Sequence, residues 1–90
     1  MSQTKLNVEQ IRSQLHTLQS DIQRLSDKKP NDNINEFKLK FINQTLEKCN
    51  ELLGNSRPYE SFTTFDTDML PTNSDVMIIL DLYYDAMYEL

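Results

Sequence analysis

The sequence has little of what catalytic and metal-binding sites are usually built from. Its 90 residues include one cysteine, one histidine, one glycine and no tryptophan. The single cysteine, Cys49, excludes an internal disulfide, and the single histidine, His16, excludes a histidine-rich metal cluster. One glycine is too few for a glycine-rich phosphate loop. We therefore expect no cofactor.

Long apolar runs are also missing. The longest one covers residues 76–80, whereas a membrane-spanning helix needs about 18 apolar residues or more. Residues 1–5 are not followed by the apolar run of a secretory signal. A lone cysteine in a short chain is typical of a reducing compartment. We expect an intracellular protein, cytoplasmic or nuclear, without a membrane span.

Basic residues are absent from the last third of the chain. Residues 58–90 contain seven acidic residues and no lysine or arginine, whereas residues 1–57 contain all nine basic residues and seven acidic ones. The net charge is -5. Because affinity for nucleic acids comes largely from cations on phosphates, we expect no nucleic-acid partner. The acidic third either keeps the chain soluble or meets a basic surface.

The first helix is expected over residues 8–26. Asn7 can cap it, Leu6 can pack against Ile11 as a hydrophobic staple, and Pro30 ends it. Its apolar residues follow an unbroken heptad spacing. They are Val8, Ile11, Leu15, Leu18, Ile22 and Leu25. One narrow stripe predicts one neighbouring helix.

The second helix is expected over residues 34–53, with Asn33 as its cap and Gly54 at its C-terminal end. Its apolar face is wider and consists of two seams. The first contains Leu39, Ile42, Leu46, Cys49 and Leu53, and the second contains Ile34, Phe37, Phe41 and Leu52. The first seam predicts an antiparallel, coiled-coil-like hairpin with the first helix, and the second predicts another neighbour.

A long connection over residues 55–71 separates the hairpin from the third helix. It contains Pro58 and Pro71 and shows no helical period. It also carries the aromatic residues Tyr59, Phe62 and Phe65. Two interpretations stay open. Either the aromatics pin the segment across the hairpin, or the segment stays mobile until a partner orders it.

The third helix is expected over residues 73–89, capped by Thr72 or Asn73. Residues 76–80 alone would also suit a buried strand. The spacing of Asp81, Asp85 and Glu89 favours a helix with one polar stripe. Its apolar residues cover most of the circumference, which is typical of a helix packed on more than one side. We assign Val76, Ile79, Leu80 and Tyr83 to the hairpin side.

The candidates for chemistry are few. Cys49 falls in an apolar seam, which predicts a buried, unreactive thiol, and His16 falls on the polar side of its helix. The pairs Asp66 with Asp68 and Asp81 with Asp85 lack the pattern of a calcium loop. We expect no catalytic residue and no metal ligand, and hence no enzyme.

Together these patterns predict a single all-α domain over residues 1–90: an antiparallel helical hairpin plus a third helix after a long loop. In general composition it resembles small coiled-coil subunits of multi-protein assemblies. We expect an interaction module, a subunit or adaptor of a complex, that binds a protein partner or its own copy through its C-terminal helix and heptad seams. The residues expected to contact the partner are Met77, Tyr84, Tyr88, Tyr59, Phe62 and Phe65. The alternative is an acidic regulatory or inhibitory protein whose C-terminal third binds a basic target surface.

Overall fold

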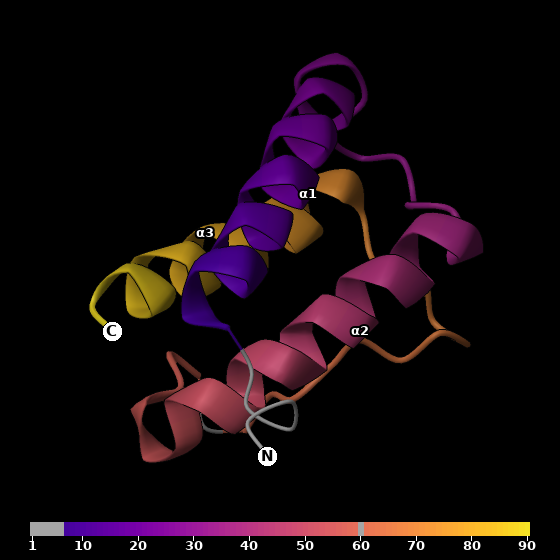
Figure 1. The fold of residues 1–90 in the computed structure, drawn as a ribbon. Helices are drawn as coiled ribbons and strands as arrows, with labels where there is room; N and C mark the ends of the chain where they lie inside the picture. The colour runs from indigo at the N-terminus through magenta and orange to yellow at the C-terminus, as the bar shows by residue number, and fades with distance from the viewer. Residues whose placement is uncertain (1–6, 60) are drawn as a thin grey trace.

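The computed structural model describes residues 7–59 and 61–90, and within them the chain forms three α-helices and one 3-10 turn (Figure 1). The helices are α1 (Val8–Lys28), α2 (Glu36–Leu53) and α3 (Asn73–Tyr88), and the turn η2 (Gly54–Ser56) follows α2. The expected all-α class is confirmed, and residues 76–80 are helical rather than a strand.

Helix α1 begins where the sequence predicts. The side chain of Asn7 accepts a hydrogen bond from the backbone N–H of Gln10 at 3.0 Å, which satisfies one of the donors left free at a helix start. The helix ends at Lys28, two residues beyond the expected end at residue 26. The staple between Leu6 and Ile11 involves a residue outside the described part of the chain.

The predicted cap of α2 is wrong by two residues. Asn35, and not Asn33, accepts the hydrogen bond from the backbone N–H of Lys38, at 2.8 Å. Asn33 has another role, because its side-chain amide donates to the carbonyl of Leu70 at 2.7 Å. The end of α2 is as expected: Gly54 has φ 54°, a backbone conformation that favours glycine.

Helix α3 is capped by Thr72, whose side chain accepts a hydrogen bond from the backbone N–H of Asp75 at 3.2 Å. Asn73, the alternative cap, is instead the first helical residue. Its side-chain amide donates to the carbonyl of Lys29 at 2.9 Å, across the turn that follows α1. The start of α3 is therefore attached to the connection between α1 and α2.

The order in which the helices pack differs in part from the predicted hairpin. Helices α1 and α2 do run in opposite directions (Figure 1). However, α1 packs more closely against α3 than against α2. Helix α3 also runs opposite to α1, so residues 61–72 must return along α2 before α3 can begin (Figure 1).

One apolar core holds the three helices together. It takes the first seam of α2 and part of the heptad stripe of α1, and from α3 it takes the four residues assigned to the hairpin side together with Met77 and Met87. The buried residues are Ile11, Leu15, Ile22, Ile34, Leu39, Ile42, Leu46, Cys49, Leu53, Val76, Met77, Ile79, Leu80, Tyr83 and Met87. Tyr83 is fully buried, and its hydroxyl donates to the side-chain oxygen of Asn50 at 2.5 Å.

The long connection lies against α2. Asn43 holds it twice: its side-chain amide donates to the carbonyl of Phe65 and its side-chain oxygen accepts from the N–H of Phe65, both at 2.9 Å. Asn50 donates to the carbonyl of Thr63 at 2.8 Å. Phe62 and Phe65 are half-buried against the core. The packing of Phe62 and Phe65 agrees with the interpretation in which aromatics pin the segment to the helices.

Candidate functional site

Three hollows in the described part of the molecule lie between α1 and α2. Two of them share Leu18 and Phe41 and have volumes of about 410 and 510 Å³. A third, of about 390 Å³, shares Leu25, Lys28 and Lys38 with the second and continues towards the turn between the helices. We call this row of hollows the α1–α2 groove.

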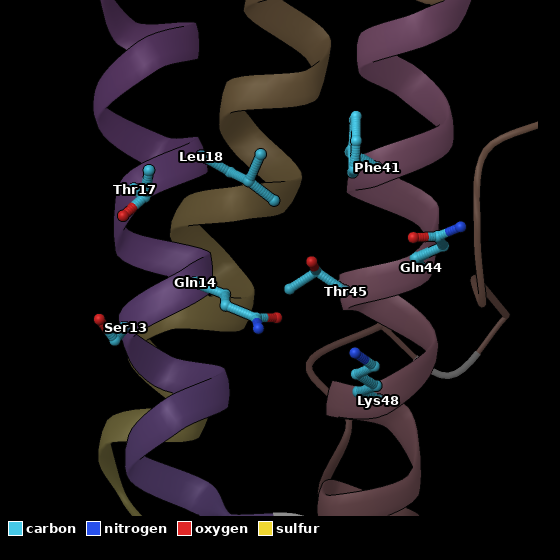
Figure 2. A pocket seen from close by; sticks show the side chains of 8 residues that line it. All are labelled: Ser13, Gln14, Thr17, Leu18, Phe41, Gln44, Thr45 and Lys48. Atoms are coloured by element: carbon cyan, nitrogen blue, oxygen red, sulfur yellow. The ribbon is translucent and has the colours of Figure 1, made fainter.

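Figure 2 shows the part of the groove nearest the N-terminus of α1, with α1 and α2 as its walls and α3 behind them. Leu18 points from α1 into the space between the helices, and Thr45 points into it from α2 (Figure 2). The hollow is lined by Ser13, Gln14, Thr17, Leu18, Phe41, Gln44, Thr45 and Lys48. The lining of this hollow therefore comes from α1 and α2 alone.

Two phenylalanines of α2 stand at this groove and are exposed. The side chain of Phe37 is 70% exposed and that of Phe41 is 50% exposed, and their rings meet edge to face with 5.0 Å between centroids. Leu18 and Leu25 on the opposite wall are only half-buried. Burial of an apolar side chain is worth about 1.5–3 kcal/mol, so this cluster forgoes a substantial stabilisation in the free protein.

The exposure of Phe37 and Phe41 corrects the expectation that the second seam of α2 packs within the fold. At about 100° per residue, Phe37 lies roughly 150° and Phe41 roughly 110° from the middle of the buried stripe of α2. Helix α3 packs over the first seam and α1, and so cannot reach that far around α2. Only Ile34 and Leu52 of the second seam are buried or half-buried. The width of the apolar face was the signal in the sequence for an uncovered surface.

The predicted contact residues of α3, Met77, Tyr84 and Tyr88, do not lie together on one surface. Met77 is only 6% exposed and belongs to the core, which takes it out of any surface of this fold. Tyr84 is half-buried against the ring of His16, with centroids 5.7 Å apart. Tyr88 is exposed, and the guanidinium of Arg12 lies 5.5 Å from its ring centroid. The two tyrosines thus lie against α1, away from Phe37 and Phe41.

The aromatics of the connection form a separate group. Tyr59 is exposed and stacks on Phe62 with 6.1 Å between centroids. Phe62 also meets Phe65 edge to face at 5.0 Å and Tyr83 at 6.3 Å. Phe62 and Phe65 therefore anchor the connection to the core, and Tyr59 is the exposed end of that stack.

The outer face of α3 is acidic with two apolar residues in it. Asp81, Asp85 and Glu89 are exposed, as the predicted polar stripe requires. Ile78 and Leu82 lie on the same face and are 58% and 41% exposed. The face thus combines carboxylates with a small apolar patch.

The residues considered for chemistry lie in ordinary settings. Cys49 is fully buried, and burial raises the pKa of its thiol to about 12, which keeps it protonated at neutral pH. Burial also raises the pKa of the Tyr83 hydroxyl. His16 is exposed on α1. Asp66 accepts a hydrogen bond from the N–H of Asp68 at 2.8 Å, which is a local turn contact.

Within residues 7–59 and 61–90 there is neither a metal-binding cluster nor a membrane-spanning helix. The side chains of His, Cys, Asp and Glu do not gather there in groups of three or more that would hold a metal ion. Nor does this part of the chain contain a helix with the length and apolar character needed to cross a membrane.

Comparison of the chain with protein-family models, with curated protein sequences and with solved structures gives no match. The function must therefore be inferred from the α1–α2 groove and the other exposed surfaces.

Proposed function

We propose that this protein is a non-enzymatic interaction module, a small helical subunit or adaptor, that binds a helix of a partner protein in the α1–α2 groove. The observation that carries the proposal is the exposure of Phe37 and Phe41 beside the half-buried Leu18 and Leu25. Apolar side chains gathered along a groove are typical of sites that receive the apolar face of a helix.

The size of the groove supports a helical occupant. Its α1 wall extends from Ser13 to Lys28, which corresponds to about 24 Å of helix axis. A partner helix of about sixteen residues would match this length. Seated between α1 and α2, it would complete a four-helix arrangement and cover both phenylalanine rings.

The proposal is tested with an 18-residue helical peptide that carries leucine at the i, i+3, i+4 and i+7 positions and glutamine elsewhere. We expect saturable binding, with NMR shifts at Leu18, Leu25 and Phe41. Phe41→Glu should abolish binding. Ile78→Glu is the matched control, because it places the same charge at an exposed apolar position on the outer face of α3, and it should bind as the unchanged protein does.

Two results would contradict the proposal. One is the absence of saturable binding by a protein that is folded by circular dichroism. The other is a dimer in light scattering that Phe41→Glu converts to a monomer, because the occupant of the groove would then be a second copy of this chain.

A second candidate function is supported by the acidic face of α3. Asp81, Asp85 and Glu89 surround the exposed Ile78 and Leu82. In that case the protein would be an acidic regulator or inhibitor that binds a basic surface through this face. Substitutions at the same two positions separate the two candidates, because Ile78→Lys would then weaken binding of a native target while Phe41→Glu would leave it unchanged.

A further inference from the structure

The charged residues that line the α1–α2 groove are mostly basic, although the chain as a whole is acidic. Its lining includes Arg24 and Lys28 from α1 and Lys38 and Lys48 from α2. The acidic residues that line it are Asp21 in the second hollow and Asp32 in the third. A chain with a net charge of -5 thus has a groove with cations on both walls.

Three of these cations have no counter-ion in the described part of the protein. The ion pairs there join Arg24 to Asp21, Lys29 to Asp32 and Lys40 to Glu36. Lys28, Lys38 and Lys48 belong to none of these pairs. Their charges are available to an occupant of the groove, because Asp21 and Asp32 are paired with Arg24 and Lys29.

From this we infer that the groove binds an acidic amphipathic helix, one whose leucine-like stripe meets Phe37, Phe41, Leu18 and Leu25 and whose flanking Asp and Glu residues meet Lys28, Lys38 and Lys48. The inference rests on the proposed function and adds the chemistry of the partner. Carboxylates on both edges of the helix pair with cations on both walls, which selects this partner over a neutral or basic helix.

The rest of the surface reinforces the selection. The outer face of α3 is acidic and repels an acidic helix, so productive encounters are directed to the groove. The occupant is a helix rather than a nucleic acid because the groove presents Leu18, Phe37 and Phe41, apolar side chains that phosphates cannot use. The chain also carries no basic residue after Arg57 that could extend a phosphate-binding track.

Three fluorescent 18-residue peptides test the inference. They share one leucine stripe and differ only in the flanking residues, which are glutamate, glutamine or lysine. We expect the glutamate peptide to bind roughly three- to tenfold more tightly than the glutamine peptide and the lysine peptide to bind least. The difference should shrink as salt rises from 50 to 500 mM, because exposed ion pairs are screened.

Substitutions locate the charges that matter. Lys38→Gln combined with Lys48→Gln should remove most of the preference for glutamate and leave the affinity for the glutamine peptide unchanged. Lys40→Gln is the matched control on the same helix, because Lys40 is paired with Glu36 and does not line the groove. It should leave the preference intact. All these side chains reach solvent, and circular dichroism confirms that each variant folds.

The outcomes separate two claims: that the groove binds a helix, and that this helix is acidic. Equal affinity for the glutamate and glutamine peptides, or tighter binding of the lysine peptide, overturns the acidic partner and leaves the helix-binding groove standing. Displacement of the glutamate peptide by a poly-thymidine oligonucleotide at equal concentration also overturns it, since the site would then take any polyanion. If none of the three peptides binds, the proposed function itself fails.

Discussion

Helix α1 packs against α3 on one side and faces α2 across an open groove on the other, and the two sides are built from different kinds of contact. On the α3 side, polar side chains close the edges of an apolar interface. The guanidinium of Arg12 donates to the carbonyl of Met87 at 2.9 Å, and Gln19 donates to Asp81 at 2.6 Å. On the α2 side, the corresponding edge consists of exposed phenylalanine rings and unpaired lysines.

The contrast separates residues on the α3 side of α1, which stabilise the fold, from residues on the α2 side, which are exposed to a partner. An apolar interface closed by hydrogen bonds is already satisfied, and a further chain would have to break those bonds to enter it. An open groove with apolar walls gains stabilisation when it is covered. Substitutions on the two sides of α1 should therefore change different properties of the protein.

The largest expected effect comes from Leu15, which is fully buried. Leu15→Ala should lower the free energy of unfolding by about 2–5 kcal/mol, a large part of the stability of a small domain. Leu18→Ala, at the next heptad position, should cost less than half as much, because Leu18 faces the groove and is half-buried. Urea unfolding followed by circular dichroism measures both. Equal losses would show that the groove side is as tightly packed as the core.

The next effect concerns Asn43, which holds the connection to α2. Asn43→Ala removes two hydrogen bonds to the backbone of Phe65 and should cost about 1–3 kcal/mol. Hydrogen exchange at the N–H of Phe65 should accelerate. Gln44→Ala, next in sequence but at the groove, is the control and should leave that exchange rate unchanged. Unaltered protection of Phe65 in Asn43→Ala would mean that other contacts hold the segment.

An alkaline transition should follow from Cys49, whose pKa is raised from the ordinary value of 9.0 to about 12. Between these values the thiol loses its proton in the unfolded chain and keeps it in the folded protein. The stabilisation is therefore complete below pH 9 and is lost as pH rises towards 12, by up to about 1.4 kcal/mol per pH unit. Thermal melting across this range should show a smaller pH slope for Cys49→Ala. A slope identical in the two proteins would assign the transition to Tyr83 alone.

The smallest effect is expected at His16, at the edge of the α1–α3 side. His16→Ala removes one exposed ring contact with Tyr84 and should change the free energy of unfolding by less than about 0.5 kcal/mol. Peptide affinity for the groove should not change. A folded His16→Ala protein that loses its binding would place the functional surface on the opposite side of α1 from the one proposed.

The sequence predicts the helices better than their neighbours. Asn7, Thr72 and Gly54 mark helix ends correctly because capping is a local property of the chain. Asn33 misleads because its side chain is taken by Leu70, a contact between segments far apart in the sequence. No local pattern encodes that competition between Asn33 and Asn35.

The sequence predicts the apolar surfaces of the candidate site but not which of them stays exposed. The heptad stripe of α1 and the wide face of α2 predict apolar surfaces, but the spacing does not say which seam α3 will cover. Met77 and Phe41 look alike in the pattern, and the fold buries the first and leaves the second 50% exposed. That choice depends on the path of residues 61–72 along α2, which brings α3 onto α1.

The close packing of α1 against α3 also has a consequence during synthesis. The partner that covers most of the apolar stripe of α1 is complete only at Tyr88, after residues 29–88 have been added. At the usual rate of translation, the synthesis of these residues takes roughly 3–12 s. During that time α2 is the neighbour available to Ile11 and Leu15. A nascent or truncated chain without α3 would expose that stripe and become a substrate for chaperones or for aggregation.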